Sequence, residues 1–157
     1  FRYALPLEGA LPDYRETQLS RQGIGAEQIA RVHFSQGDPC NLKPVYQGYD
    51  LVLAVNLLEQ LREPARFVTE IVQRLNRGGV LLLSSAYQWQ EAITPQENWL
   101  GGRRENGEAL GSYQALQRLL APYCDELDAP QALLFWRRDN ARHLHALRSE
   151  VTCWRRR

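Results

Sequence analysis

Residues 49–56 read Tyr49-Asp50-Leu51-Val52-Leu53-Ala54-Val55-Asn56, an apolar run with polar residues at its ends. Runs of this kind are typical of strands that are buried on both faces in a parallel sheet. A helical turn is predicted over 57–61, and Pro64 suits the first turn of a helix because its fixed φ is already helical. Apolar residues then recur at helical spacing as far as Leu75.

A second strand follows this helix. The segment 76–79 contains Gly78 and Gly79, and we expect it to end the helix because glycine tolerates positive φ. Val80 to Ser85 is again apolar and predicts a second buried strand. Strand, helix and strand in this order form a βαβ unit, so the strands at about 50–55 and 79–85 should be parallel. The sequence therefore predicts the α/β class.

Upstream of this unit the pattern is weaker. Pro6, Gly9 and Pro12 predict a loop, and helices are expected near 13–22 and 26–31. Residues 31–36 alternate apolar and polar side chains, which predicts a strand that ends at a turn beginning with Gly37.

Downstream, residues 86–111 predict a long loop that carries several aromatic side chains. A loop of that length in a compact domain is usually functional. An amphipathic helix is expected over 113–123. Strands are expected at 132–137 and 147–154, with a turn at 139–142, and together they predict an antiparallel hairpin.

Composition places the chain among ordinary globular proteins. It has 157 residues, 44% hydrophobic and 24% charged, and a formal net charge of +1, so no global field indicates a nucleic-acid or membrane partner. No apolar run approaches the roughly 20 residues that span a bilayer. Three widely separated cysteines form no metal or disulfide pattern and favour a reducing, cytoplasmic compartment.

Candidate site residues stand where the predicted strands end. Ligands of open α/β sheets bind at the carboxyl ends of the strands, which here carry Asp38, Asn56 and Ser84-Ser85-Ala86. The Asp38 carboxylate is suited to accept hydrogen bonds from a nucleoside, but its spacing alone favours an Asx turn. Asn56 either caps the next turn or presents its backbone to a ligand, and both interpretations stay open.

Three aromatic residues and two histidines are further candidate site residues. Tyr87, Trp89 and Trp99 in the long loop are able to stack on a flat substrate or cover a cation, or else they pin the loop to the core. His143 and His145 would share one face of a strand, as in a metal pair. No third ligand is arranged near them in the sequence, so we expect polar surface and no metal site.

The order of these features resembles the second half of class I S-adenosylmethionine-dependent methyltransferases over about residues 32–85. A narrower resemblance, to the methyltransferase domain of ovothiol biosynthesis, extends from one end of the chain to the other. It is carried by the segments at 2–6, 36–43, 48–54, 99–102 and 149–154. The resemblance implies a partial Rossmann-like sheet, mostly parallel with a C-terminal antiparallel hairpin.

The resemblance also implies a function. It implies methylation of an imidazole ring nitrogen of mercaptohistidine, a small-molecule substrate, with S-adenosyl-L-methionine as methyl donor. Many members carry this domain behind an iron-dependent sulfoxide synthase. Two alternatives remain: a methyltransferase for another small molecule, and a non-catalytic Rossmann-like remnant or interaction module.

Site roles carry over position by position. Asp38 matches the acidic residue that contacts the adenine amine, while Pro39 and Cys40 would line the adenine pocket. Asn56 and Leu57 match the segment that touches the methionine part of the cofactor. The substrate pocket is expected at Tyr87, Trp89 and Trp99, and the resemblance assigns no catalytic residue.

The chain departs from the family pattern at its start. The glycine-rich loop after the first strand is missing, and Gly23-Ile24-Gly25 follows no buried strand. With no methionine and Phe1 at its start, residues 1–157 are expected to be the C-terminal two-thirds of one methyltransferase domain, without its first two strands. Alone, this piece is expected to be inactive. Because the edge of the strand at 50–55 is open, the piece is also expected to dimerise, to rearrange or to be ordered by upstream residues.

Overall fold

The structure is a computed structural model that describes residues 1–157. The chain forms two compact units, which are described separately. The small unit comprises residues 1–36 and 135–147. The sheet unit comprises residues 37–134 and 148–157.

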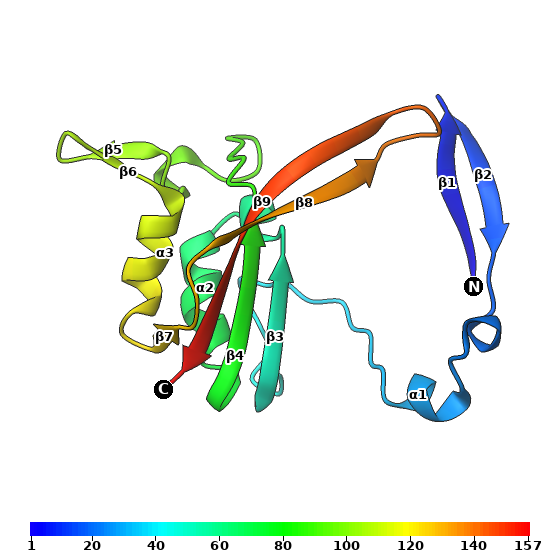
Figure 1. Ribbon diagram of the computed structural model, residues 1–157, viewed down its shortest axis with the longest axis horizontal. Helices are drawn as coiled ribbons and strands as arrows, with labels where there is room; N and C mark the ends of the chain where they lie inside the picture. Colours follow the sequence, from blue (N-terminus) through cyan, green and yellow to red (C-terminus); the bar gives the residue numbers. More distant parts are fainter. The chain divides into compact units, whose positions relative to one another are not determined.

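The predicted βαβ unit is the centre of the sheet unit (Figure 1). Strand β3 (Tyr49–Val55) is parallel to β4 (Leu75–Ser85), and helix α2 (Pro64–Val72) connects them with Pro64 in its first turn. The parallel pairing is therefore confirmed. The helix ends earlier than predicted, because residues 75–79 already belong to β4 and pair irregularly with β3 before the regular register begins.

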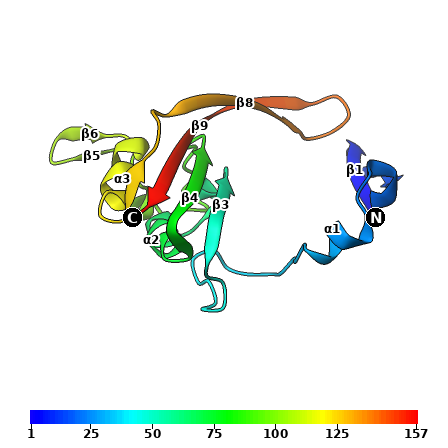
Figure 2. The ribbon, with the colours of Figure 1, turned by 60° about the horizontal axis from the view of Figure 1, so that its bottom comes forward.

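Strand β4 lies between β3 and the long strand β9 (Leu144–Arg156), as both ribbon views show (Figures 1 and 2). Strand β9 runs antiparallel to β4 and to β7 (Cys124–Glu126), and it also pairs with β8 (Gln131–Arg138). The α/β class and the C-terminal hairpin are confirmed, and both hairpin strands are longer than predicted. The parallel pair β3–β4 is thus extended by antiparallel neighbours.

The two faces of this sheet have different surroundings. On the covered face, Ala54, Leu81, Leu83 and Trp154 are each at most 2% exposed. They share one buried cluster with side chains of α2 and of α3 (Ser112–Leu120), so these helices cover this face.

The open face carries the alternate residues of the same strands. Leu51, Leu53 and Val55 are 56%, 59% and 58% exposed. The prediction that β3 is buried on both faces is therefore wrong: this face has no second layer of helices in the structure, and an apolar run alone does not reveal that.

The long segment after β4 contains short elements in place of a plain loop. A 3-10 turn η2 (Leu58–Gln60) follows β3 as predicted, and another, η3 (Gln96–Asn98), lies beyond β4. Strands β5 (Arg103–Glu105) and β6 (Glu108–Leu110) form a small hairpin directly before α3.

The small unit differs most from expectation. Strands β1 (Arg2–Glu8) and β2 (Leu11–Glu16) form an antiparallel hairpin, followed by η1 (Leu19–Gln22) and α1 (Ala26–Ala30). The predicted loop at residues 6–12 is a tight turn at Gly9, where φ is +53°. The helix predicted for 13–22 is wrong, because pairing with β1 satisfies the backbone of β2 and a local pattern does not show that partner.

The strand predicted at 31–36 does not form either. No other segment pairs with it, and Val32 and Phe34 are 58% and 88% exposed. Alternating side chains favour a strand only where a neighbour accepts its backbone hydrogen bonds. The helix predicted for 26–31 is confirmed as α1.

All three cysteines are free. Cys40 and Cys124 are buried, and burial raises the pKa of both thiols. Cys153 is half-buried on β9, opposite Leu82 of β4, and therefore belongs to the open face. Separately, no helix is both long enough and apolar enough to cross a bilayer.

Candidate functional site

Two residues with unusual backbone geometry follow the parallel strands at their carboxyl ends. Asn56, directly after β3, has a φ of +48°, and Tyr87, shortly after β4, has a φ of +52°. Residues other than glycine seldom adopt positive φ, and such geometry is concentrated at functional sites. The sheet edge at which the sequence predicts a ligand therefore has two non-glycine residues with positive φ beside it.

Asn56 is held by hydrogen bonds to residues of β4 and β9. Its backbone N–H donates to the carbonyl oxygen of Ser84 at 2.8 Å and lies 3.1 Å from the Ser84 hydroxyl. Its side-chain Oδ1 accepts a hydrogen bond of 2.6 Å from the Ser149 hydroxyl of β9. These bonds hold the positive φ in place and leave the Asn56 amide group little freedom to move.

A buried carboxylate lies behind this edge. Glu59, in η2, is 5% exposed and accepts hydrogen bonds from the Ser85 hydroxyl at 2.6 Å and from the Ala86 N–H at 3.2 Å. The Ser85 oxygen in turn accepts from the Tyr87 N–H at 2.9 Å. Sequence analysis missed Glu59, although a charged residue inside the predicted turn at 57–61 was a usable signal.

Tyr87 connects this network to a cavity. Its hydroxyl donates to Glu150 Oε1 at 2.9 Å, and burial, assisted by this carboxylate, raises the pKa of Tyr87. The phenol therefore stays protonated and acts as a donor. Ser85, Tyr87, Arg148 and Glu150 are among the residues that line a cavity of about 290 Å³ at the end of β4.

The predicted adenine residues form a separate turn. Asp38 is exposed, and its Oδ1 accepts from the Cys40 N–H at 2.9 Å, which is an Asx turn. The Cys40 side chain is 6% exposed and its thiol donates to the Glu63 carbonyl at 3.5 Å, while Pro39 is half-buried. Leu57 is partly buried against the core. No hydrogen bond links this turn to Asn56 or Leu57.

The three predicted substrate rings do not gather around one cavity. The Trp89 indole donates to the Ser112 hydroxyl at 3.0 Å, and the Trp99 indole donates to the Thr94 carbonyl at 2.8 Å. Tyr87 lines the cavity at the end of β4, Trp99 lines a different one, and Trp89 lines neither. Each ring anchors its loop, and the substrate role remains a prediction.

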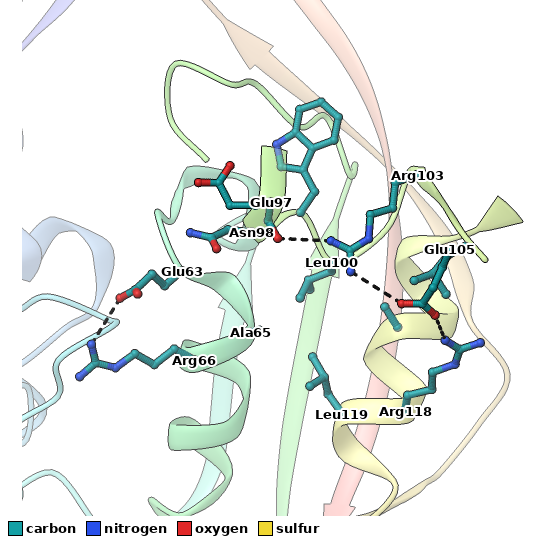
Figure 3. A pocket seen from close by; sticks show the side chains of 13 residues that line it. Glu63, Ala65, Arg66, Glu97, Asn98, Leu100, Arg103, Glu105, Arg118 and Leu119 are labelled. Atoms are coloured by element: carbon teal, nitrogen blue, oxygen red, sulfur yellow. Dashed lines mark hydrogen bonds and ion pairs between the residues drawn. The ribbon is translucent and has the colours of Figure 1, made fainter. Parts of the chain in front are cut away.

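The cavity beside Trp99 has about 400 Å³ of space and lies between α2, α3 and the segment 97–105 (Figure 3). Its arginines are all engaged. Arg118 lies 2.7 Å from a Glu105 oxygen, and Arg66 lies 3.3 Å from Glu63. Arg103 donates to the Glu97 carbonyl at 3.3 Å and lies 3.9 Å from Glu105. No arginine of this cavity is left unpaired to attract an anion, so the edge after β3 and β4 is the better candidate site.

Part of the chain matches a known protein family. Residues 10–83 match the family described as "Methyltransferase domain". This span contains Asp38, Asn56, Glu59 and nearly all of β4. No curated protein matches the chain at a significant level.

Solved structures support the same fold. One neighbour is described as "Conversion of a Disulfide Bond into a Thioacetal Group during Echinomycin Biosynthesis". It is 17% identical to this chain with a TM-score of 0.56, and the match covers 87% of this chain and 59% of the neighbour. The [4+2]-cyclase SpnF is 17% identical with a TM-score of 0.51, over 88% and 60%. A SAM-dependent methyltransferase from Methanosarcina mazei is 16% identical with a TM-score of 0.50, over 76% and 65%.

These likenesses concern the fold. At such identities they establish a Rossmann-like α/β sheet of the kind found in methyltransferases. This chain spans less than two thirds of the length of each of the three structures. The cyclase among them illustrates that one fold carries different chemistries.

Proposed function

We propose that this protein acts in S-adenosylmethionine-dependent methylation and that its substrate is mercaptohistidine, methylated on an imidazole nitrogen. One observation carries the proposal. The match to methyltransferase domains covers β3 and β4 as far as Leu83, and these parallel strands end in a polar edge with positive φ at Asn56 and, beyond the matched residues, at Tyr87. The carboxyl ends of parallel strands are where this fold class binds nucleotide-like ligands.

The turn at Asp38 and the end of β3 each carry groups that could hold the cofactor. Asp38 is exposed and only its Oδ1 is engaged by Cys40, so Oδ2 is available to an adenine amine. Asn56 and Leu57 stand at the end of β3, where the methionine part would lie. When bound, S-adenosylmethionine supplies an electrophilic methyl group.

The chain's own groups would hold and orient the ring that accepts the methyl. A neutral imidazole nitrogen is itself a nucleophile, so alignment and exclusion of water matter more than a base. Tyr87 remains a protonated donor in the wall of the cavity after β4, and Glu150 beside it is a carboxylate that can accept a ring N–H.

The first test is direct. The complete methyltransferase domain, with residues 1–157 as part of it, is incubated with S-adenosylmethionine and mercaptohistidine, and mass spectrometry follows the N-methyl product. Histidine and imidazole thiols other than mercaptohistidine compete in parallel. A preferred product from one of these competitors would replace the substrate and keep the reaction class, whereas absence of cofactor binding by the complete domain in calorimetry would overturn the reaction class.

Two kinds of variant locate the site. Asp38→Ala removes a charge-assisted hydrogen bond worth about 1.5–3 kcal/mol, so cofactor affinity should fall about ten- to hundredfold. Ala in place of Tyr87, Trp89 or Trp99 should lower turnover. Glu108→Ala, at an exposed carboxylate of β6 that lines neither of the two cavities, is the control. A dissociation constant for Asp38→Ala within twofold of the parent would leave Asp38 as a turn residue only.

One observation favours the second candidate, a non-catalytic interaction module. The open face of β3 presents exposed Leu51, Leu53 and Val55, and apolar patches of this kind mark association surfaces. A protein that binds a partner through this face and never binds S-adenosylmethionine would support the module.

A further inference from the structure

The small unit contains a cluster that the proposed function does not use. It lies at the turn between β8 and β9, where the Asp139 N–H donates to the His143 carbonyl at 3.0 Å. The Arg142 N–H donates to Asn140 Oδ1 at 2.8 Å inside the same turn. These bonds shape the turn so that the side chains of Asp139 and His143 approach each other.

Three ligand-type atoms converge there. Asp139 Oδ2 lies 3.1 Å from His143 Nδ1 and is also in close contact with His145 Nε2. All three atoms lie within 4.8 Å of one another, and the two imidazole rings meet edge to face with centroids 4.5 Å apart. The sequence showed the histidine pair without a third ligand. In the structure, Asp139 is the third ligand-type residue of this cluster.

We propose that Asp139, His143 and His145 form a binding site for a divalent transition-metal ion of the zinc class. Bonds of about 2.0–2.1 Å to a tetrahedral ion place neighbouring ligand atoms about 3.3 Å apart. The Asp139–His143 separation is already close to that value. Imidazole with carboxylate is a donor set that suits Zn²⁺, Ni²⁺ and Cu²⁺.

The orientation of Asp139 is also set. Arg137 Nε donates to Oδ1 at 3.3 Å, so the other oxygen, Oδ2, faces both imidazoles. Partners in this position orient metal ligands in known sites. The side chains of Asp139, His143 and His145 are 33%, 59% and 41% exposed, which leaves room for water to complete the coordination.

Neighbouring charges limit the affinity. Arg137 bonds to Asp139 itself, Arg138 donates to the Asn140 carbonyl at 3.0 Å, and Arg142 lies 3.2 Å from Glu8. Three guanidinium groups near the turn disfavour a cation, whereas Glu8 offsets one of them. We therefore expect micromolar binding rather than the tight binding of a buried structural zinc site.

Calorimetric titration of the 157-residue protein with ZnCl₂, under a non-chelating phosphine reductant, tests the site. One ion per chain should bind. NMR of the histidine rings, which needs no substitution, should show zinc-dependent shifts at His143 and His145 and none at His33.

Variants separate the site from adventitious binding. Asp139→Asn and His145→Gln should each weaken zinc binding about tenfold or more. His33→Ala and Cys153→Ser are matched controls and should bind as the parent does, and circular dichroism checks that every variant is folded. No binding at millimolar zinc, or equal binding by all variants, would mean that the cluster is only a set of histidine–aspartate contacts.

Discussion

The two faces of the central sheet are built from the same strands and much the same residues, yet one is dry and the other exposed. Leu81 on the covered face is 0% exposed, whereas Leu53 on the open face is 59% exposed. Helices α2 and α3 cover the first face and no element covers the second. An apolar strand sequence therefore allows burial on both faces, and the layers that pack against the sheet decide which face is buried.

The strongest predicted loss of stability is found by replacing one leucine on each face with alanine and comparing the two variants. Leu81→Ala should lower the free energy of unfolding by about 2–5 kcal/mol, because it leaves a cavity in a closed cluster. Leu53→Ala should change it by only about 0.5 kcal/mol, as exposed substitutions do. Urea unfolding of both variants measures the contrast, and equal losses would show that the open face is packed in solution.

A buried polar group at the strand ends comes next. Glu59→Ala removes the acceptor of the Ser85 hydroxyl and the Ala86 N–H, and it should cost about 1–3 kcal/mol because both donors stay away from water. Glu97→Ala, at an exposed carboxylate, is the control. If the two variants unfold at the same urea concentration, the network behind the sheet edge contributes nothing to stability.

The open face also predicts self-association, since β3 is the edge strand of the sheet and its face is apolar. Leu53→Lys should weaken a dimer about tenfold or more, equal to about 1.4 kcal/mol. Leu133→Lys changes an exposed leucine of β8 and should leave association unchanged. Sedimentation equilibrium measures both, and a monomeric parent protein would contradict the expectation.

The smallest effect concerns how α3 is attached to the sheet. The Tyr113 hydroxyl donates to Glu126 of β7 at 2.8 Å, and burial followed by this carboxylate raises the pKa of Tyr113 to about 12. The folded chain then holds this proton more tightly than the unfolded chain, whose tyrosines titrate near pH 10. The resulting stability is complete below about pH 10 and is lost as pH rises through 12.

Tyr113→Phe should therefore flatten the alkaline loss of stability between pH 10 and 12. The measurement is a series of urea unfolding curves across that range. Tyr123→Phe, at a tyrosine that is 40% exposed, should retain the full loss. An identical pH dependence in Tyr113→Phe and the parent would rule out the Tyr113–Glu126 contact as its source.

Local pattern predicted those elements whose partners are close in sequence. The unit from β3 to β4 was predicted correctly because its strands and helix are consecutive, and the pairing of β8 with β9 followed from the short turn at 139–142. The strand at Leu11–Glu16 was missed, and the one at 31–36 was wrongly predicted, because pairing partners decide both.

The site was predictable to the same degree. Strand ends pointed to Asn56 and to the segment near Tyr87, because the carboxyl edge of a parallel pair is a property of the sequence order. Glu59, Glu150 and Asp139 were not predicted as site residues, since their contacts join segments that fold together only in three dimensions. Glu59, for example, would be expected on the surface from the sequence alone, but contacts with Ser85 and Ala86 make it a buried hydrogen-bond acceptor.

The placement of the three thiols gives the protein a built-in attachment point for a reporter dye. Cys40 and Cys124 are buried and their raised pKa values keep them as unreactive thiols, whereas Cys153 is partly accessible on the open face. A maleimide fluorophore should therefore label the native chain at Cys153 first. Its emission would change when another molecule covers the neighbouring Leu82 and Leu53. The native cysteines thus supply a site-selective sensor of that surface without any substitution.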